Sequence, residues 1–221
     1  MQYDKTSAES IYAFAKTLTG SSLGRVANIP PEVLNELNKG DLGSLLEKYF
    51  FEHRPPNDHN PDFAEAGVEL KATGVLKDSK VPGGYKAKER LVLTMINFER
   101  LVDETWETSS LMFKCRLLLV LFYLYEKDKS VLNRTFLLDP MMLRELARAE
   151  EDLEQIRLDW EAIRQKVVDG KAHELSEGDT KYLGACTKAA NSRIRTAQPN
   201  SDEDAKPRAF SLKQGYLTSL L

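Results

Sequence analysis

The chain has 221 residues with 31 basic and 34 acidic side chains, a formal net charge of -3 and 42% apolar residues, which is an ordinary globular composition. This composition excludes collagen-like, low-complexity and wholly disordered proteins, while two cysteines cannot build a disulfide framework and three histidines lack zinc-site spacing. Because the N-terminus lacks the apolar run of a signal peptide and no apolar run is long enough to cross a bilayer, we expect a reduced, cytoplasmic protein.

The N-terminal part of the chain predicts two helices. Residues 7–19 form an amphipathic pattern with Ser7 as the N-cap, and a second helix is expected from Asp41 because leucines recur at helical spacing after it. Residues 53–61 are rich in proline and asparagine and must end this second helix.

A strand and a loop are expected next. Residues 67–73 alternate apolar and polar side chains, which predicts a half-buried strand with Glu69 and Lys71 on one face. Residues 76–87 contain two glycines and three lysines, which suggests a mobile basic loop, and residues 91–96 are too short to assign.

The rest of the chain predicts further strands and a long helix. Residues 117–125 are typical of a buried central strand, and residues 131–138 are expected to be its neighbour. A long helix is predicted over residues 140–168, then a last strand over residues 205–212 and a helix beginning near Tyr216. Helices that alternate with strands indicate an α/β or α+β protein.

Charge is unevenly distributed along the chain. Residues 71–90 and 181–216 each have a balance of +4, whereas residues 139–161 have a balance of -5. Such a pattern suits a protein with one anion-binding face, and ordinary variation of surface charge explains it equally well.

The strongest candidate for chemistry is the set Asp62, Glu69 and Lys71. An acid in a turn followed by Glu-x-Lys on a strand places two carboxylates and an ammonium at one edge of a sheet. Magnesium prefers such oxygen ligands, and a metal held there can stabilise charge on phosphate oxygens. Taken alone the pattern is common, and Glu-x-Lys usually marks only the wet face of a strand.

Glu47 and Lys114 are further candidates. Glu47 lies on the predicted second helix, where its carboxylate either points at the same site or pairs with a neighbouring basic side chain. Lys114 and Arg116 stand at the start of the apolar strand, and a solvated strand end explains them as well.

The strings GDLGSLLEKYF, PDFAEAGVELKATG and AKERLVLTMIN resemble the DNA endonuclease family that joins the mismatch-repair nicking enzyme MutH to type II restriction enzymes cutting at GATC. The strings KAHELSEGDTKYLGACTKAAN and KPRAFSLKQGYLTSLL resemble the restriction branch more closely. The resemblance implies an α/β PD-(D/E)xK restriction-endonuclease-like fold, with a mixed central sheet flanked by helices and a DNA cleft between two lobes.

The resemblance also implies roles for individual residues. Asp62 and Glu69 resemble the metal-binding carboxylates, Glu47 the additional helix carboxylate, Lys71 the lysine that positions the attacking water, and Lys114 a lysine facing the cleft. The implied reaction is Mg²⁺-dependent hydrolysis of phosphodiesters in double-stranded DNA, which leaves 5′-phosphate and 3′-hydroxyl ends.

A reading loop is expected after Cys186. Lys188 can bond guanine acceptors, Asn191 can pair with adenine, and Arg193 follows them as a further DNA-binding residue of this loop. Arg208 and Lys213 are expected to contact DNA phosphates. A polar surface loop is the simpler interpretation of the same segment. His173 and Cys186 lack partners at suitable spacing and are assigned no chemistry.

The leading hypothesis is a type II restriction endonuclease that cuts at GATC. Cys186, Thr187 and Ser211 replace an arginine, a proline and a tyrosine of the nicking branch, which favours restriction. The alternatives are a mismatch-repair enzyme that nicks one strand at GATC and a non-cleaving DNA-binding domain of a longer restriction enzyme. We expect one catalytic domain over residues 1–221, the N-terminal part of a longer chain, which acts with a second subunit or a second DNA-binding domain.

Overall fold

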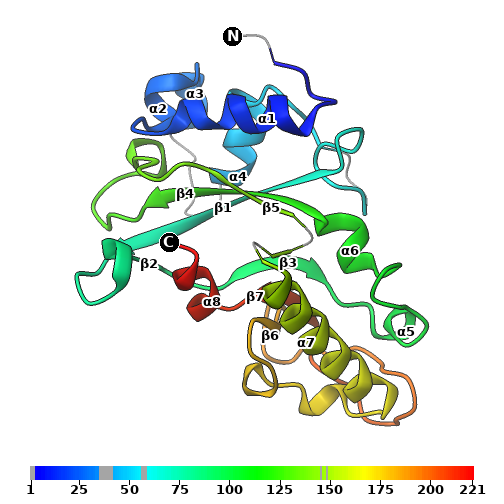
Figure 1. Cartoon of the computed structure of the whole chain (residues 1–221). Coiled ribbons are helices and arrows are strands. Elements are labelled where there is room, and N and C mark those ends of the chain that lie inside the picture. The colour runs from blue at the N-terminus through cyan, green and yellow to red at the C-terminus, as the bar shows by residue number, and fades with distance from the viewer. Residues whose placement is uncertain (1–2, 35–41, 56–58, 145, 148) are drawn as a thin grey trace. The chain divides into compact units, whose positions relative to one another are not determined.

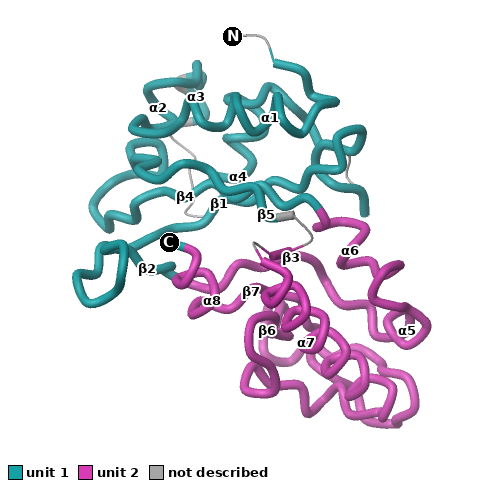
Figure 2. The backbone as a smooth tube through the Cα atoms, in the orientation of Figure 1, with its two compact units in different colours: residues 1–88, 117–143, 221 teal, residues 89–116, 144–220 magenta. Residues whose placement is uncertain are grey.

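The computed structural model describes residues 3–34, 42–55, 59–144, 146–147 and 149–221. It divides into two compact units, which Figure 2 distinguishes by colour. Unit 1 comprises residues 1–88, 117–143 and 221, and unit 2 comprises residues 89–116 and 144–220. No helix in these described ranges is long and apolar enough to span a membrane.

Unit 1 is built on a four-stranded sheet in the order β2-β1-β4-β5, with α1 and α4 above one face (Figure 1). Its elements are α1 (Ala8–Ala15), η1 (Lys16–Leu18), α2 (Leu23–Val26), α3 (Pro31–Leu34), α4 (Leu42–Leu45), the π-helix η2 (Leu46–Phe50), β1 (Val68–Lys77), η3 (Pro82–Gly84), β2 (Tyr85–Ala87), β4 (Leu117–Leu124), η4 (Val131–Asn133) and β5 (Met141–Arg144), whose last residue is counted in unit 2.

The sheet of unit 1 is mixed. β1 runs parallel to β4 from the pair Val68–Leu117 to the pair Val75–Leu124, and antiparallel to β2. Both central strands are mostly apolar because a parallel pair is buried on its faces. Ile11, Leu46 and Phe51 are fully buried in the cluster that joins the helices to this sheet.

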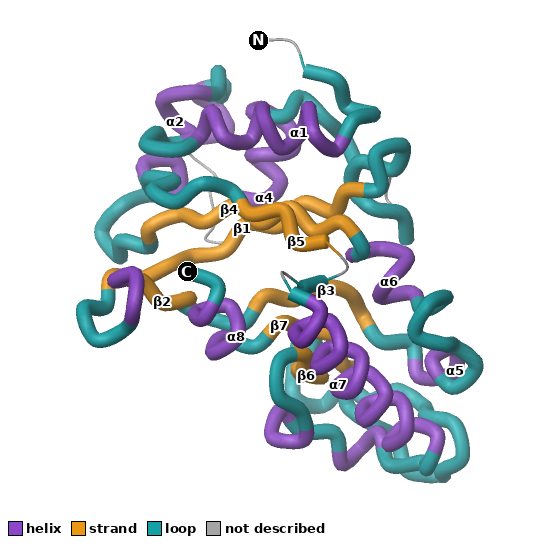
Figure 3. Tube along the Cα trace, in the orientation of Figure 1, coloured by secondary structure: helices purple, strands orange, loops and turns teal. Residues whose placement is uncertain are grey.

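Unit 2 contains a three-stranded antiparallel sheet in the order β3-β7-β6 (Figure 3). Its elements are β3 (Leu91–Met95), α5 (Phe98–Leu101), α6 (Ser110–Cys115), α7 (Glu150–Val168), η5 (Ala172–Glu174), η6 (Glu177–Asp179), β6 (Leu183–Thr187), β7 (Arg208–Leu212) and α8 (Gln214–Ser219). The inner side of α7 buries Ile156, Trp160 and Ile163, and Trp160 meets Trp106 edge to face at 5.8 Å.

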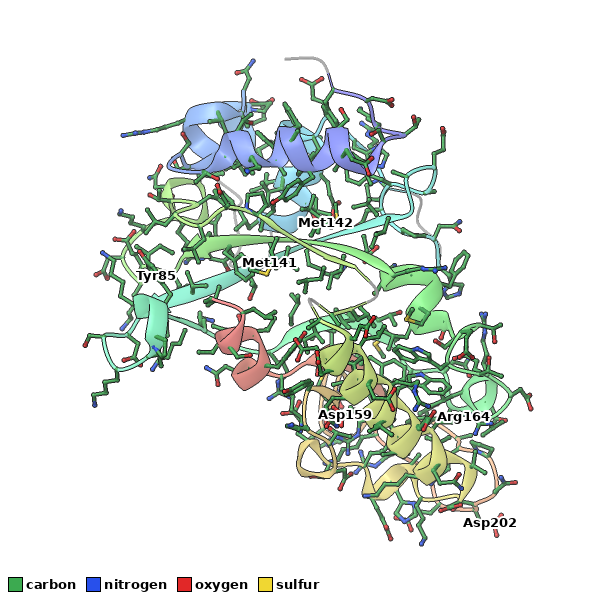
Figure 4. The ribbon with its side chains drawn as sticks, viewed as in Figure 1. Tyr85, Met141, Met142, Asp159, Arg164 and Asp202 are labelled. Carbon is green, nitrogen blue, oxygen red and sulfur yellow. The ribbon has the colours of Figure 1, made fainter. Side chains whose placement is uncertain are left out.

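Asp159 fixes β6 to α7. Its carboxylate, labelled in Figure 4, is buried and accepts hydrogen bonds from the backbone N–H groups of Lys181, Tyr182 and Leu183. Three N–H groups at the entrance to β6, which have no partner in the sheet ladder, are satisfied in this way.

Several predicted elements are confirmed. The first helix begins after Ser7, whose side chain accepts from the N–H of Ser10, and the buried strand over residues 117–124 is present. The mixed α/β class with helices against a mixed sheet is also confirmed. Both cysteines are buried and free. Asp41, from which the second helix was expected, lies outside the described residues, and helix is described from Leu42.

Other predictions are wrong. Residues 76–87 are not a loop but a hairpin, in which β2 pairs with β1. The neighbour of β4 is β5, over residues 141–144, and not residues 131–138, where a single turn of 3-10 helix forms. The long helix begins at Glu150, because residues 141–144 are a strand. The strand β6 was missed, and the last helix begins at Gln214.

Candidate active site

A tight turn holds Asp62 beside Glu69. Phe63 and Val68 form an isolated antiparallel bridge in which each N–H donates to the other's carbonyl oxygen, at 2.9 and 3.2 Å. Gly67 closes the turn at φ 67°, a conformation that glycine adopts without a side-chain clash. Asp62 precedes one partner of this bridge and Glu69 follows the other, so the bridge brings the two acids together.

The acids Asp62 and Glu69 are locked by reciprocal hydrogen bonds. The N–H of Asp62 donates to Oε2 of Glu69 at 3.1 Å, and the N–H of Leu70 donates to Oδ2 of Asp62 at 2.8 Å. Nζ of Lys71 donates to Oε1 of Glu69 and, at 3.3 Å, to the carbonyl oxygen of Leu70. Glu69 and Lys71 thus share one face of β1, as predicted.

The prediction that the polar face of this strand is exposed to solvent is wrong for Glu69. Its side chain is only 1% exposed, whereas that of Lys71 is 23% exposed. A buried carboxylate is costly unless it is paired and hydrogen-bonded, and Lys71 and Asp62 supply both kinds of contact. The alternation of apolar and polar residues predicted that Glu69 and Lys71 share a face of β1. It did not predict how deeply that face is buried, because the burial comes from β4 and the helices that cover β1.

Glu47 belongs to the same cluster. It lies on the π-helix η2, whose residues Leu46 and Phe50 face the core. Burial, followed by the negative charges of Asp62 and Glu69, raises the pKa of Glu47 from 4.5 to about 7, although Lys71 acts in the opposite direction. The three carboxylates are therefore close enough for each charge to disfavour the next.

His53 was missed by the sequence analysis and links the two acidic elements. Its backbone N–H donates to the carbonyl oxygen of Glu47 at 2.8 Å, and its Nε2 donates to the carbonyl oxygen of Asp62. The ring stacks on Phe63 with centroids 4.4 Å apart. The only sequence signal for a role of His53 at this site was its position, just before the proline-rich segment and the PDF string.

The cluster suits a hard cation by its donor chemistry. No group of three or more His, Cys, Asp or Glu side chains in the described part of the chain is arranged to hold a metal ion. Magnesium, however, uses only one or two protein carboxylates and takes its other ligands from water and phosphate. Asp62 and Glu69 offer oxygen donors only. The pKa of Glu47 is raised first by burial and then by the negative charges of Asp62 and Glu69, and a cation would offset these charges.

Lys114 lies in unit 2, whereas the carboxylate cluster lies in unit 1. It lies in the last turn of helix α6, not at the start of the strand as the sequence suggested, and is partly buried. The neighbouring Phe113 is 59% exposed.

The predicted DNA contacts all belong to unit 2. Lys188, Asn191 and Arg193 are exposed in the segment that follows β6, and Oδ1 of Asn191 accepts from the N–H of Arg193 at 3.0 Å. Arg208 is only 9% exposed, donates to the carbonyl oxygen of Ala185 at 3.1 Å, and has a pKa lowered by burial.

Arg208 and Lys213 differ from the exposed loop residues, because the protein's own carbonyl oxygens bind their charged groups. Nζ of Lys213 donates to the carbonyl oxygens of Glu177 and Thr180, so its ammonium is bound by the protein itself. Arg208 therefore links β7 to β6, and Lys213 links the end of β7 to the segment before β6. Their contact with DNA phosphates stays a prediction.

Comparison with known proteins identifies relatives of this chain. The family model described as the DNA mismatch repair enzyme MutH matches residues 51–159, which include Asp62, Glu69, Lys71 and Lys114. The type II restriction enzyme Sau3AI of Staphylococcus aureus is 46% identical over 83% of this chain and 37% of its own length.

Two mismatch-repair relatives match over nearly their whole length. The DNA mismatch repair protein MutH of Shigella flexneri serotype 5b and that of Escherichia coli O127:H6 are each 30% identical over 96% of this chain and 91% of their own length. The chain therefore spans most of the mismatch-repair relatives but little more than a third of the restriction enzyme.

Proposed function

Because the chain belongs to the MutH family, we propose that it is a sequence-specific DNA endonuclease of the type II restriction class, which hydrolyses phosphodiesters at GATC and leaves 5′-phosphate ends. The observation that carries this proposal is the hydrogen-bonded set of Asp62, Glu69 and Lys71, with Glu47 in electrostatic contact. The greater identity to a type II restriction enzyme, 46% against 30%, favours restriction over mismatch repair.

Magnesium is the proposed cofactor, held by Asp62 and Glu69 with Glu47 as the third carboxylate. The bound ion would activate water and stabilise the charge that develops on the phosphate. The N–H groups of Asp62 and Leu70 fix the two carboxylates from the backbone, so that their oxygens are held before DNA arrives.

Lys71 is proposed to orient the attacking water. Its ammonium is held by Glu69 and the carbonyl oxygen of Leu70, which places it beside the two carboxylates. A cation at this point also stabilises the negative charge of the transition state. Lys114 stays a prediction for a cleft-facing lysine, and the cleft between two lobes is part of the same proposal.

Double-stranded DNA is proposed to contact the exposed segment after β6. Lys188, Asn191 and Arg193 offer donors for base edges and phosphates, and residues 180–201 contain no acidic side chain that would repel DNA. Cutting of both strands is proposed to need a second subunit, or a second DNA-binding domain as suggested by the greater length of the restriction relative.

Strand nicking at GATC is the second candidate, because the chain covers 91% of the mismatch-repair relatives. The two candidates differ in product. Incubation of a supercoiled plasmid that contains GATC with the full chain and Mg²⁺ yields linear fragments with ends at GATC if the protein is a restriction enzyme, and open circles if it nicks.

Controls separate chemistry from folding. EDTA should abolish cutting, and Asp62→Asn should abolish it while binding to a GATC duplex is retained. Asp78→Asn is the matched control, because Asp78 pairs with Lys86 on the β1–β2 hairpin and has no part in the cluster. Cutting that survives Asp62→Asn, or cutting without any relation to GATC, would contradict the proposal. Retained GATC binding by wild type without any cutting would instead indicate a non-cleaving DNA-binding domain.

A further inference from the structure

The segment between β6 and β7 has a defined base and a defined far end. The N–H of Lys188 donates to the carbonyl oxygen of Pro207 at 2.9 Å, which extends the β6–β7 ladder by one step. Thr196 and Ala205 then form a second, isolated bridge with hydrogen bonds of 2.8 and 2.9 Å. Residues 189–195 bulge out between these two points and are all exposed.

Gln198 lies just beyond the second bridge and is buried, with 5% exposure. Its Oε1 accepts from the N–H of Ala172 at 2.6 Å, and its Nε2 donates to the carbonyl oxygen of Glu203. Nε2 also lies 2.9 Å from Nδ1 of His173. One amide therefore ties both sides of the loop 197–204 to η5, the turn that follows helix α7.

The partners fix the orientation of this amide. Ala172 offers a donor and Glu203 an acceptor, so the oxygen must face Ala172 and the nitrogen must face Glu203. His173 must then accept at Nδ1 and carry its proton on Nε2, which faces Oε1 of Glu174 at 3.8 Å and Oε2 of Glu203 at 3.5 Å. A glutamine satisfies this set because it has a donor and an acceptor on one planar group.

A close backbone approach adds to the anchor. Nδ2 of Asn200 donates to the carbonyl oxygen of Val168 at 2.8 Å. Gly170, at φ 71°, lies so near that an added Cβ would stand 2.3 Å from the carbonyl oxygen of Asn200. The loop 197–204 is thus seated on the C-terminal end of α7 by polar contacts and a glycine.

We propose that Gln198 is a positioning residue for DNA recognition, which anchors the far end of the segment so that residues 189–195 are held ready for DNA. This inference rests on the proposed function. Lys188, Arg193 and Arg195 repel one another and face solvent, so without an anchored far end the segment would sample many conformations. Holding it in place lowers the ordering cost that binding would otherwise incur.

The test uses an isosteric change in the full chain. Gln198→Glu keeps the size of the side chain and its bond from Ala172 but removes both donated bonds, and Gln198→Ala removes all three. Gln165→Glu makes the same charge change at an exposed position on α7 and is the control. Melting temperature and circular dichroism report whether each variant is folded.

Three readouts follow. Trypsin cleavage after Lys188, Arg193 and Arg195, mapped by mass spectrometry, should accelerate about tenfold in Gln198→Glu, because the loss of a satisfied buried bond favours local opening by that order. Affinity for a GATC duplex in EDTA should fall about tenfold, while affinity for a scrambled duplex changes less than about threefold. The ¹⁵N shifts of His173 in wild type should show Nδ1 unprotonated.

Opposite results would overturn the inference. Unchanged trypsin cleavage in Gln198→Glu would mean that its donors do not anchor the segment. Faster cleavage with an unchanged ratio of GATC to scrambled affinity would reduce Gln198 to a fold anchor and refute its role in recognition. A wild-type chain that does not prefer GATC would contradict the proposed function instead, and the proteolysis would still decide whether Gln198 anchors the loop.

Discussion

Replacement of Glu47 by glutamine should stabilise the metal-free protein above neutral pH. The folded protein keeps the proton on Glu47 up to a pKa of about 7, whereas the unfolded chain releases it near 4.5. The native state thus binds more protons between these values, and its stability falls as the pH rises from about 4.5 through 7. Glutamine has no titratable proton, so the replacement removes this fall in stability with rising pH.

The size of the effect follows from the pKa shift and the exposure of the side chain. A change from 4.5 to about 7 corresponds to ~3 kcal/mol for a fully buried group. Because Glu47 is only partly buried, water screens the neighbouring charges, and we expect about 1–2 kcal/mol. In a chain of this length that is a rise in melting temperature of roughly 2–6 °C.

Thermal unfolding followed by circular dichroism in EDTA, from pH 4 to pH 8, measures this difference. Glu47→Gln and wild type should melt together at pH 4 and diverge progressively from about pH 4.5 to about pH 7, with the variant more stable and the difference constant above that pH. Glu65→Gln, an exposed acid in the turn between Asp62 and Glu69, should not diverge in this way. A variant that is no more stable at pH 8, or whose advantage grows toward acid, would refute the crowding of three carboxylates.

Three other changes test separate parts of the molecule. Lys188→Ala should weaken binding to a GATC duplex about tenfold more than to a scrambled duplex in a filter-binding assay, and an equal loss on both would reduce Lys188 to a phosphate contact. Asp159→Ala should lower the free energy of unfolding in urea by ~3 kcal/mol, since three backbone donors lose their acceptor, while Asp169→Ala at the exposed end of α7 should cost under ~0.5 kcal/mol. His53→Phe should keep the stacking on Phe63 and lower the cleavage rate without affecting DNA affinity, and an unchanged rate would separate His53 from the site.

The cluster around Glu69 was predictable because its chemistry is local in sequence. Asp62, Glu69 and Lys71 lie within ten residues, and a two-residue repeat on a strand places Glu69 and Lys71 on one face whatever the rest of the fold does. For Glu47 the sequence left two alternatives open, since helical spacing alone does not say which face of a helix meets a distant strand, and the family resemblance favoured one of them.

Other features depend on contacts between distant segments and left no local signal. The hairpin over residues 76–87 is glycine- and lysine-rich and has weak strand propensity, yet β1 offers it a free edge. The predicted helix over residues 140–168 begins with the strand β5 instead, because these residues pair with β4 in the sheet. Lys213 looks like a surface cation in the sequence, but its carbonyl partners lie more than thirty residues earlier in the chain.

The residues proposed for catalysis lie in unit 1, and the exposed residues proposed for DNA recognition lie in unit 2. The carboxylates and Lys71 are held by contacts within unit 1, through the bridge at Phe63 and the hydrogen bonds of His53. Lys188, Arg193 and their anchor at Gln198 are held by contacts within unit 2. Because the hydrogen bonds described for each set lie within one unit, a substitution in one set should leave those of the other formed. Under the proposed function this separation explains why a chain can change its reading loop, as at Cys186 and Thr187, and retain the same catalytic residues.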